Sequence, residues 1–210
     1  MATYGTAGLS LRGTARQLGV TAPAIYNYYR RLDDLITALI VEAFAALAEA
    51  MDAAGKATPS DRCFDNVMAQ CLAYRQWAVE HPLHFQLIYG NPIPGYFAPS
   101  EQTAVLARRP FVELFRWFAR GYETGELTIP VEYRDTPLRM AASISAWKRA
   151  SGIEIPDALV ALLMSGWARI HGVVMLELFG HIQPLVGEGS DFFRSEVAAF
   201  ARQMGMTGKE

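Results

Sequence analysis

The stretch SLRGTARQLGVTAPAIYNYY, residues 10–29, decides the fold of the N-terminal part of the chain. Two helices that meet at a steep angle need a small residue where their backbones approach, and Ala15 meets this need. Four residues later, Gly19 can take the left-handed backbone of a tight turn without steric cost. Ile25, ten residues after Ala15, can lock the second helix against the first. The residues expected to complete this small core are Leu11, Leu18 and Val20. The pattern predicts a helix-turn-helix.

The second helix of this motif carries side chains that suit a DNA surface. With Val20 and Ile25 turned inward, the residues expected to point partly outward are Thr21, Ala22, Ala24, Asn27 and Tyr28. An Asn can hydrogen-bond adenine in the major groove, and Ala or Thr can contact a thymine methyl. Tyrosine hydroxyls and the first amides of a helix suit phosphate oxygens. The alternative is that Tyr26, Tyr28 and Tyr29 form an aromatic staple under the next helix.

The charge distribution supports a polyanionic partner for this end of the chain. Residues 1–31 contain four arginines and no acidic residue. Because the formal net charge of the 210 residues is −2, residues 32–210 carry −6. A positive end on a negative body indicates that the N-terminal unit binds a polyanion.

The rest of the chain is expected to be helical, because Ala, Leu and Met are abundant and alternating strand patterns are scarce. The helices that we expect cover residues 10–18, a stretch from 21, residues 32–54, 60–80, a short one after Pro82, residues 101–124, 138–150, 156–181 and 190–204. The sequence therefore predicts an all-α protein. It divides into a helix-turn-helix unit at residues 1–45 and a helical ligand-binding and dimerisation domain at 46–210, with the helix from residue 32 spanning both.

Two helices in the last third of the chain are apolar on more than one side. Between residues 158 and 179 the charged residues are Arg169 and Glu177. A helix that is apolar nearly all round must be covered on both sides, by its own core and by a partner. Two such helices from each of two chains would form a four-helix interface. The residues that we assign to this dimer face are Leu163, Ile170, Val173, Val174, Phe193, Val197 and Phe200. Gly166 and Gly172, which are costly inside a helix, are best explained by close helix approach.

Aromatic residues cluster in the middle of the chain and are candidates for a ligand pocket. The set comprises Tyr74, Trp77, Phe85, Tyr89, Phe115, Phe118, Tyr122, Trp147, Trp167 and His171. Pockets are mostly apolar with a few polar groups, which predicts a small apolar or amphipathic effector. The alternative for each aromatic residue is ordinary core packing. For His171 the alternative is a hydrogen bond to a neighbouring helix.

The N-terminal pattern resembles the DNA-binding region of the TetR family of transcriptional repressors. The matching residues are Gly8, Ser10, Arg12, Ala15, Gly19, Val20, Tyr26, Tyr29 and Leu35. The resemblance implies that Ser10, Arg12 and Tyr26 contact the DNA backbone. It also implies that Thr21, Ala22, Pro23 and Ala24, with Asn27, enter the major groove. Trp167, His171 and Gly172 resemble a variant of the family's C-terminal domain, and the dimer face lies where members of the family dimerise.

The chain departs from the family pattern in two places. Where the family has a phosphate-binding lysine, this sequence has Leu32, and Arg30 or Arg31 is expected to substitute. The family also has a helix before the conserved glycine, whereas seven residues precede Gly8 here and are too few to form it. Two interpretations stay open: the sequence is truncated at its start, or the first helix is absent and DNA binding has been lost. In the second case the protein would be a dimeric small-molecule-binding protein.

Other function classes find little support. No nucleophile elbow, phosphate-binding loop or suitable pair of carboxylates indicates an enzyme. His81 and His84 lack further ligands at metal-binding spacing, so neither a metal nor a cofactor is expected. Cys63 and Cys71, the two cysteines, are expected to be reduced buried thiols. No signal peptide and no membrane span are expected, which gives a cytoplasmic location by default. We therefore expect a homodimeric, ligand-responsive regulator that binds a near-palindromic double-stranded DNA operator.

Overall fold

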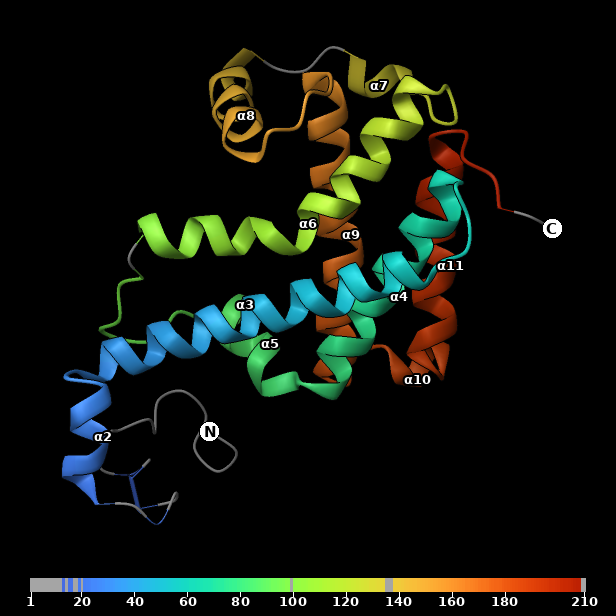
Figure 1. The fold of residues 1–210 in the computed structure, drawn as a ribbon. Helices are drawn as coiled ribbons and strands as arrows, with labels where there is room; N and C mark the ends of the chain where they lie inside the picture. The colour runs from blue at the N-terminus through green and yellow to red at the C-terminus, as the bar shows by residue number, and fades with distance from the viewer. Residues whose placement is uncertain are drawn as a thin grey trace.

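The computed structural model describes residues 13, 15, 16, 19, 21–98, 100–134 and 138–208, and the regular structure in this part is helical (Figure 1). The helices are α2 (Ala22–Tyr28), α3 (Leu32–Ala57), α4 (Cys63–Glu80), α5 (Pro82–Tyr89), α6 (Ser100–Glu123), α7 (Val131–Arg134), α8 (Leu138–Ser151), α9 (Asp157–Leu178), α10 (Gln183–Val186) and α11 (Gly189–Gln203). The expectation of an all-α fold is confirmed for these residues. The sequence did not predict α7 and α10, because one turn of helix is too short to show a period.

The long helix α3 joins the N-terminal unit to the body. In Figure 1, α2 lies at one end of α3, and the other end of α3 packs among the helices of the body. α3 contacts α4, α5 and α6, while α9 packs against α4 and α11. α6 bends about midway along its length (Figure 1). Pro110 lies inside this helix, and a proline there removes a backbone hydrogen bond and bends the helix.

Three groups of buried side chains follow one another along α3. The first, at its start, joins Leu35 to Ala15 and Ile25. The second joins Ile36, Ile40 and Phe44 of α3 to Leu87 of α5. The third is the main core of the body, to which α3 contributes its C-terminal half, including Leu47 and Met51. Packed side chains, and no loop, therefore connect the helices of the body to the N-terminal unit along α3.

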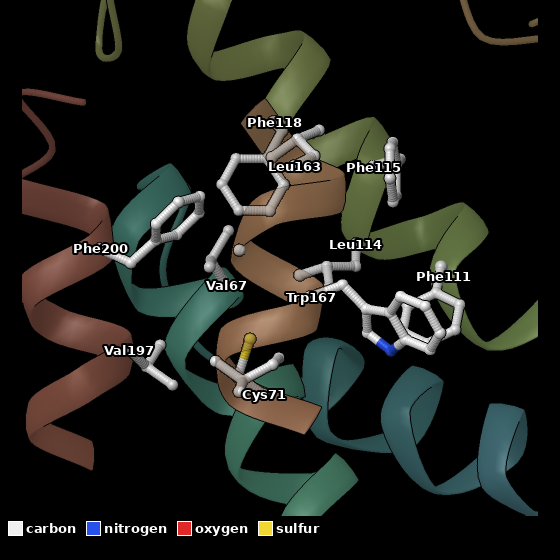
Figure 2. A pocket seen from close by; sticks show the side chains of 12 residues that line it. Val67, Cys71, Phe111, Leu114, Phe115, Phe118, Leu163, Trp167, Val197 and Phe200 are labelled. Atoms are coloured by element: carbon white, nitrogen blue, oxygen red, sulfur yellow. The ribbon is translucent and has the colours of Figure 1, made fainter. Parts of the chain in front are cut away.

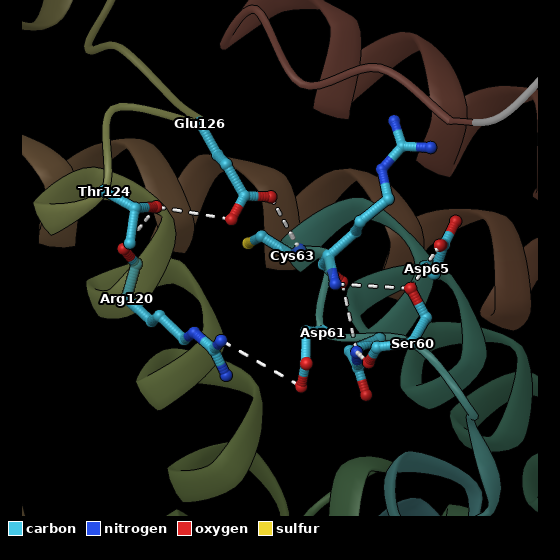
Figure 3. Close-up of polar contacts among 9 residues, drawn as sticks. Ser60, Asp61, Cys63, Asp65, Arg120, Thr124 and Glu126 are labelled. Atoms are coloured by element: carbon cyan, nitrogen blue, oxygen red, sulfur yellow. Dashed lines mark hydrogen bonds and ion pairs between the residues drawn. The ribbon is translucent and has the colours of Figure 1, made fainter.

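The N-terminus of α4 is held by side chains from other elements (Figure 3). Glu126, in the connection after α6, accepts a hydrogen bond of 2.9 Å from the backbone N–H of Cys63. A carboxylate suits this position because the first amides of a helix are otherwise unpaired and carry partial positive charge. Ser60 donates to Asp65 at 2.6 Å, which fixes the chain just before the helix. α4 therefore begins at Cys63 rather than at residue 60 as expected.

The cysteine prediction is confirmed: Cys63 and Cys71 are unpaired and buried. The Cys63 thiol donates to the backbone oxygen of Trp117 at 3.0 Å. Burial raises the pKa of each thiol to about 12, so neither forms a thiolate at neutral pH.

Helix α9 is long and apolar enough to cross a membrane by length and composition, and it is the one such helix in the part of the chain that the structure describes. Its position in the protein accounts for that composition. It contributes Leu159, Leu163, Ile170 and Val174, among others, to the main core. The core helix of a soluble protein passes the same test, so this helix is no argument for a membrane.

Candidate functional site

The helix-turn-helix core has the packing that the sequence predicted. Ala15, Ile25 and Leu35 are buried together, and Tyr29 packs against them. Gly19 has a φ of +67°, the left-handed conformation that the turn requires. Leu11, Leu18 and Val20, also expected in this core, lie outside the described residues. The aromatic staple is thus Tyr29 alone among the three tyrosines, because the side chains of Tyr26 and Tyr28 are exposed.

Helix α2 turns one face to solvent. Thr21, in extended conformation, precedes the helix, and Pro23 occupies its first turn, where a missing N–H costs nothing. The exposed residues are Thr21, Pro23, Tyr26, Asn27 and Tyr28, with Ala24 half-buried. Tyr28 is 84% exposed, so its ring and hydroxyl are both open to a partner surface. Of the other predicted DNA contacts, Ser10, Arg12 and the side chain of Ala22 lie outside the described residues.

Arg31 lies at the junction between α2 and α3. Its backbone N–H donates to Asp34 at 2.9 Å and its guanidinium donates to Asp33 at 2.8 Å. Its side chain is still 74% exposed, so several of its N–H groups remain open to solvent. The sequence predicted this cation for phosphate binding and did not predict that Asp33 would hold it.

The body contains an apolar cavity between four helices (Figure 2). Its lining comes from Val67 and Cys71 of α4, Phe111, Leu114, Phe115 and Phe118 of α6, Leu163, Gly166, Trp167 and Ile170 of α9, and Val197 and Phe200 of α11. The free space is narrow, about 30 Å³, enough for one or two water molecules. Any larger ligand must push these side chains apart.

Three of the predicted pocket residues, Phe115, Phe118 and Trp167, line this cavity. The sequence missed Phe111 and Leu114, although with Phe115 and Phe118 they form the i, i+3, i+4, i+7 stripe of an amphipathic helix.

The other predicted pocket residues divide into two groups. Tyr74, Phe85, Tyr89 and His171 form an aromatic cluster that touches the cavity through Trp167, whose ring lies 5.2 Å from that of His171. Trp77, Trp147 and Tyr122 lie elsewhere and do not line it. Trp77 packs on His81, Trp147 packs on Phe115, and Tyr122 is 41% exposed. Aromatic content alone does not distinguish a ring that packs on another ring from one that lines a cavity.

A hydrogen bond of 2.7 Å joins the hydroxyl of Tyr74 on α4 to Nδ1 of His171 on α9. This agrees with the interpretation that His171 is bonded to a neighbouring helix. Burial lowers the pKa of His171 and raises that of Tyr74 well above its ordinary value, so both side chains are held neutral. Two nearby buried groups, the hydroxyl of Tyr89 and Nε1 of Trp167, have no hydrogen-bond partner among the described residues.

The residues assigned to the dimer face pack inside the chain in this structure. All seven side chains assigned to it are buried within a single chain. Four of them, Leu163, Ile170, Val197 and Phe200, line the cavity. The periodicity of an apolar helix says which residues are covered, but not whether the cover comes from the same chain.

The exposed side of α9 carries a different apolar stripe. Met164, Ala168, Gly172 and Leu176 follow one another at intervals of four residues, and Phe179 continues the line. Met164, Ala168, Leu176 and Phe179 are exposed. α9 is therefore apolar on two faces, as the sequence predicted. The face that is exposed in one chain contains none of the residues that the sequence assigned to the dimer contact.

The two glycines of α9 also lie on different faces. A Cβ at Gly166 would lie 2.4 Å from the ring of Phe200 on α11, so the prediction of close helix approach is confirmed at this position. A Cβ at Gly172 would meet nothing within 4 Å, so within one chain no helix approaches it.

Comparison with known proteins identifies a family and relatives that this chain resembles. Residues 67–200 match the family described as "Tetracyclin repressor-like, C-terminal domain". The HTH-type transcriptional regulator Rv1816 of Mycobacterium tuberculosis is 37% identical over 177 residues, which cover 84% of this chain and 75% of that protein.

Two solved structures have a similar fold. The crystal structure of the protein SCO4313 has a TM-score of 0.73 at 29% identity, over 95% of this chain and 88% of that one. PfmR, a TetR family transcriptional regulator from Thermus thermophilus, has a TM-score of 0.59 at 14% identity, over 97% of this chain and 92% of that one, a likeness of fold alone.

The fold and these similarities define the protein as a helix-turn-helix transcriptional regulator. More narrowly, the chain belongs to the TetR family.

Proposed function

We propose that this protein is a homodimeric, cytoplasmic repressor that releases its operator when a small apolar or amphipathic molecule binds in the body. The single observation that carries the proposal is the position of α3. One end of this helix holds the exposed face of α2 through Ala15, Ile25 and Leu35, and its other end packs into the helical body that encloses the cavity. The proposed role is regulatory and not enzymatic.

The exposed face of α2 suits the major groove of DNA. Asn27 can form two hydrogen bonds with adenine, and Thr21 can contact a thymine methyl. Tyr26 and Tyr28 can donate to phosphate oxygens, and Arg31 can do so with the N–H groups that Asp33 leaves open. In a dimer, two such helices would enter successive major grooves about 34–36 Å apart, which calls for a near-palindromic operator.

The cavity suits an effector with an apolar body and a hydrogen-bonding end. Its walls are almost entirely apolar, and Nε1 of Trp167 is the buried group in the lining that can bind a polar end. The Tyr89 hydroxyl, also without a partner among the described residues, lies outside the lining beside Trp167. An effector must also move side chains, because the cavity is narrow. Tyr89 touches both Trp167 at 6.0 Å and Phe44 of α3 at 5.7 Å between ring centroids. A displaced Tyr89 would therefore press on α3, and an effector that favours the displaced position would shift the spacing of the two recognition helices.

The dimer is proposed to form through the exposed stripe of α9, made of Met164, Ala168, Gly172, Leu176 and Phe179. Ala168 and Gly172 would let a partner helix approach closely, and the larger residues would fill the contact on either side. Leu185 of α10, 86% exposed, extends the apolar surface beyond the end of the helix. In this arrangement the cavity lies within each chain, and the dimer contact lies on the opposite side of α9.

Fluorescence anisotropy with duplexes from the DNA that flanks the protein's own gene tests the DNA-binding part. At about 50 mM salt we expect tight, sequence-selective binding that weakens steeply by about 200 mM, because several phosphate contacts release counterions. Asn27→Ala should weaken specific binding about tenfold or more and leave non-specific binding nearly unchanged. Gln203→Ala, an exposed residue of α11, serves as the control. Absence of selective binding to any flanking duplex would instead favour a small-molecule-binding protein that does not bind DNA.

A further inference from the structure

A second hollow lies where α3, α4 and α6 meet, and unlike the cavity it is polar. Its lining comes from Asp52, Gly55 and Lys56 of α3, Gln70 of α4, and Glu113 and Trp117 of α6. Its free space is about 290 Å³. The two hollows have no lining residue in common.

Gln70 is the unusual residue in this hollow. Its side chain is 1% exposed, yet neither its amide oxygen nor its amide nitrogen has a hydrogen-bond partner among the described residues. A buried amide without partners is costly, by about 1–3 kcal/mol, so such groups normally bind something. The amide lies close to the backbone of α3, since a Cβ at Gly55 would lie 3.2 Å from Nε2 of Gln70.

Gly55 explains how the amide reaches the wall of the hollow. A glycine inside a helix costs about 1 kcal/mol relative to alanine, and Gly55 lies inside α3. At this position any side chain would crowd the Gln70 amide. Because Gly55 has no side chain, the Gln70 amide can lie against the backbone of α3 at this position.

The charged groups of the hollow are also incompletely paired. Oδ1 of Asp52 is buried and has no hydrogen-bond partner in the described part of the chain. Burial, together with the nearby Glu113 carboxylate, raises the pKa of Asp52, and the cations Lys56, Arg109 and Arg116 offset this only in part. Glu113 is itself paired with Arg116. Lys56, one turn after Asp52, forms no ion pair with any described residue.

These groups leave two acceptors and two donors around one space. The acceptors are Oδ1 of Asp52 and Oε1 of Gln70, and the donors are Nε2 of Gln70 and Nζ of Lys56. All but the Lys56 amine are covered in this structure, so a ligand must first displace the side chains that cover them. We propose that the hollow binds a small zwitterion with an ammonium and a carboxylate group on neighbouring atoms, of which a free amino acid is the simplest kind. The ammonium donates to Asp52 and Gln70, the carboxylate accepts from Gln70 and Lys56, and Trp117 provides an apolar wall for the rest of the molecule.

This site would give the regulator a second input. It lies on the C-terminal half of α3, the helix whose other end carries α2. It is separate from the apolar cavity and does not depend on an effector there. Binding at this site can be measured without DNA, so its failure would leave the DNA-binding proposal untouched.

Isothermal titration calorimetry on the whole chain tests the site with glycine, L-alanine, L-serine and L-glutamine as probes. Methylammonium chloride and sodium acetate represent the two halves of a zwitterion. We expect saturable binding of at least one amino acid, at least tenfold tighter than either half. Asp52→Asn and Lys56→Gln should each weaken that binding at least tenfold. Glu49→Gln, an exposed carboxylate nearly one turn earlier on α3, should leave it unchanged.

A further variant probes the geometry without altering charge. Gly55→Ala places a methyl group against the Gln70 amide, and we expect it to weaken binding while circular dichroism and the melting temperature report an intact fold. The proposal is overturned if no amino acid saturates the protein. In that case water alone occupies the hollow. It is equally overturned if methylammonium binds as tightly as the amino acids, or if Asp52→Asn, Lys56→Gln and Glu49→Gln all bind the amino acid alike.

Discussion

The hydroxyl of Tyr74 lies 2.7 Å from Nδ1 of His171, and this hydrogen bond ties α4 to α9 at the edge of the apolar cavity. Burial raises the pKa of Tyr74 and lowers that of His171, so the phenol keeps its proton and the imidazole stays neutral. The phenol therefore donates and Nδ1 accepts, which leaves the imidazole proton on Nε2. A neutral pair is the form that this apolar surrounding tolerates best.

The stability of the protein should depend on pH through His171. Burial lowers the pKa of His171 below the 6.5 of a free side chain. Between these two values the unfolded chain takes up a proton that the folded chain does not. The contribution of His171 to the free energy of unfolding is therefore complete above pH 6.5, and it is lost as the pH falls from there through the lower pKa of the folded protein.

Urea unfolding at pH 7.5, 6.5, 5.5 and 5.0 measures this dependence. We expect His171→Asn, which keeps an acceptor near the position of Nδ1, to be less stable at neutral pH but to lose less stability on acidification than the wild type. His84→Gln, an exposed histidine of α5, serves as the control and should keep the wild-type slope. Equal slopes for the wild type and His171→Asn would show that His171 is not held neutral by burial.

Much of the N-terminal unit could be predicted from the sequence, because local constraints fix it. Ala15, Gly19 and Ile25 each meet a steric need of a tight helical corner, and these needs depend on neighbours close in sequence. The helix from Leu32 was also predictable, although it continues to Ala57 instead of ending at residue 54. Gly55 looked like a helix end, whereas it lies inside the helix and makes room for Gln70.

The cavity and the dimer face could not be predicted in the same way, because they depend on which helices meet. Phe193 and Val174 are apolar in the sequence for a reason that only tertiary packing reveals: both are in the core of one chain. Likewise, the polarity of Gln70 gives no sign in the sequence that it is buried beside α3. Periodicity indicates that a residue is covered, but it does not show which residue covers it.

Gly166 should not tolerate a side chain. Gly166→Ala gains helix propensity of about 1 kcal/mol, but its methyl group would lie 2.4 Å from the Phe200 ring. Overpacking of this kind costs about 1–3 kcal/mol or more, so we expect a net loss of stability and a lower melting temperature. In a Phe200→Leu background the same substitution should cost less, because the clashing ring is gone, and a double-mutant cycle measures the difference. Additive effects would mean that the two residues do not touch.

Breaking the ion pair of Arg75 and Glu177 should lower the free energy of unfolding more than breaking an ion pair on the surface. Nε of Arg75 donates to Glu177 at 2.7 Å, and the two side chains are only 11% and 10% exposed. Glu177→Gln removes one charge and leaves the other buried, a change that costs about 3–5 kcal/mol for fully buried pairs and somewhat less here. Glu113→Gln breaks the exposed pair with Arg116 and should cost less than about 1 kcal/mol. Chemical unfolding of the two variants compares them, and similar losses would contradict the role of burial.

The exposed stripe of α9 should hold the dimer together. Leu176→Glu places a charge on the stripe, where a partner chain would bury it. A buried charge without a partner is far more costly than an exposed one, so we expect the dissociation constant of the dimer to rise at least tenfold. Gly172→Ala should also weaken the dimer, because a methyl group would hold the partner helix away, although within one chain it meets nothing. Val105→Glu, an exposed apolar residue of α6, is the control and should leave assembly unchanged. Sedimentation equilibrium across a range of concentrations separates the outcomes: a wild type that stays monomeric, or a control that dissociates as readily as Leu176→Glu, would rule out this face as the dimer contact.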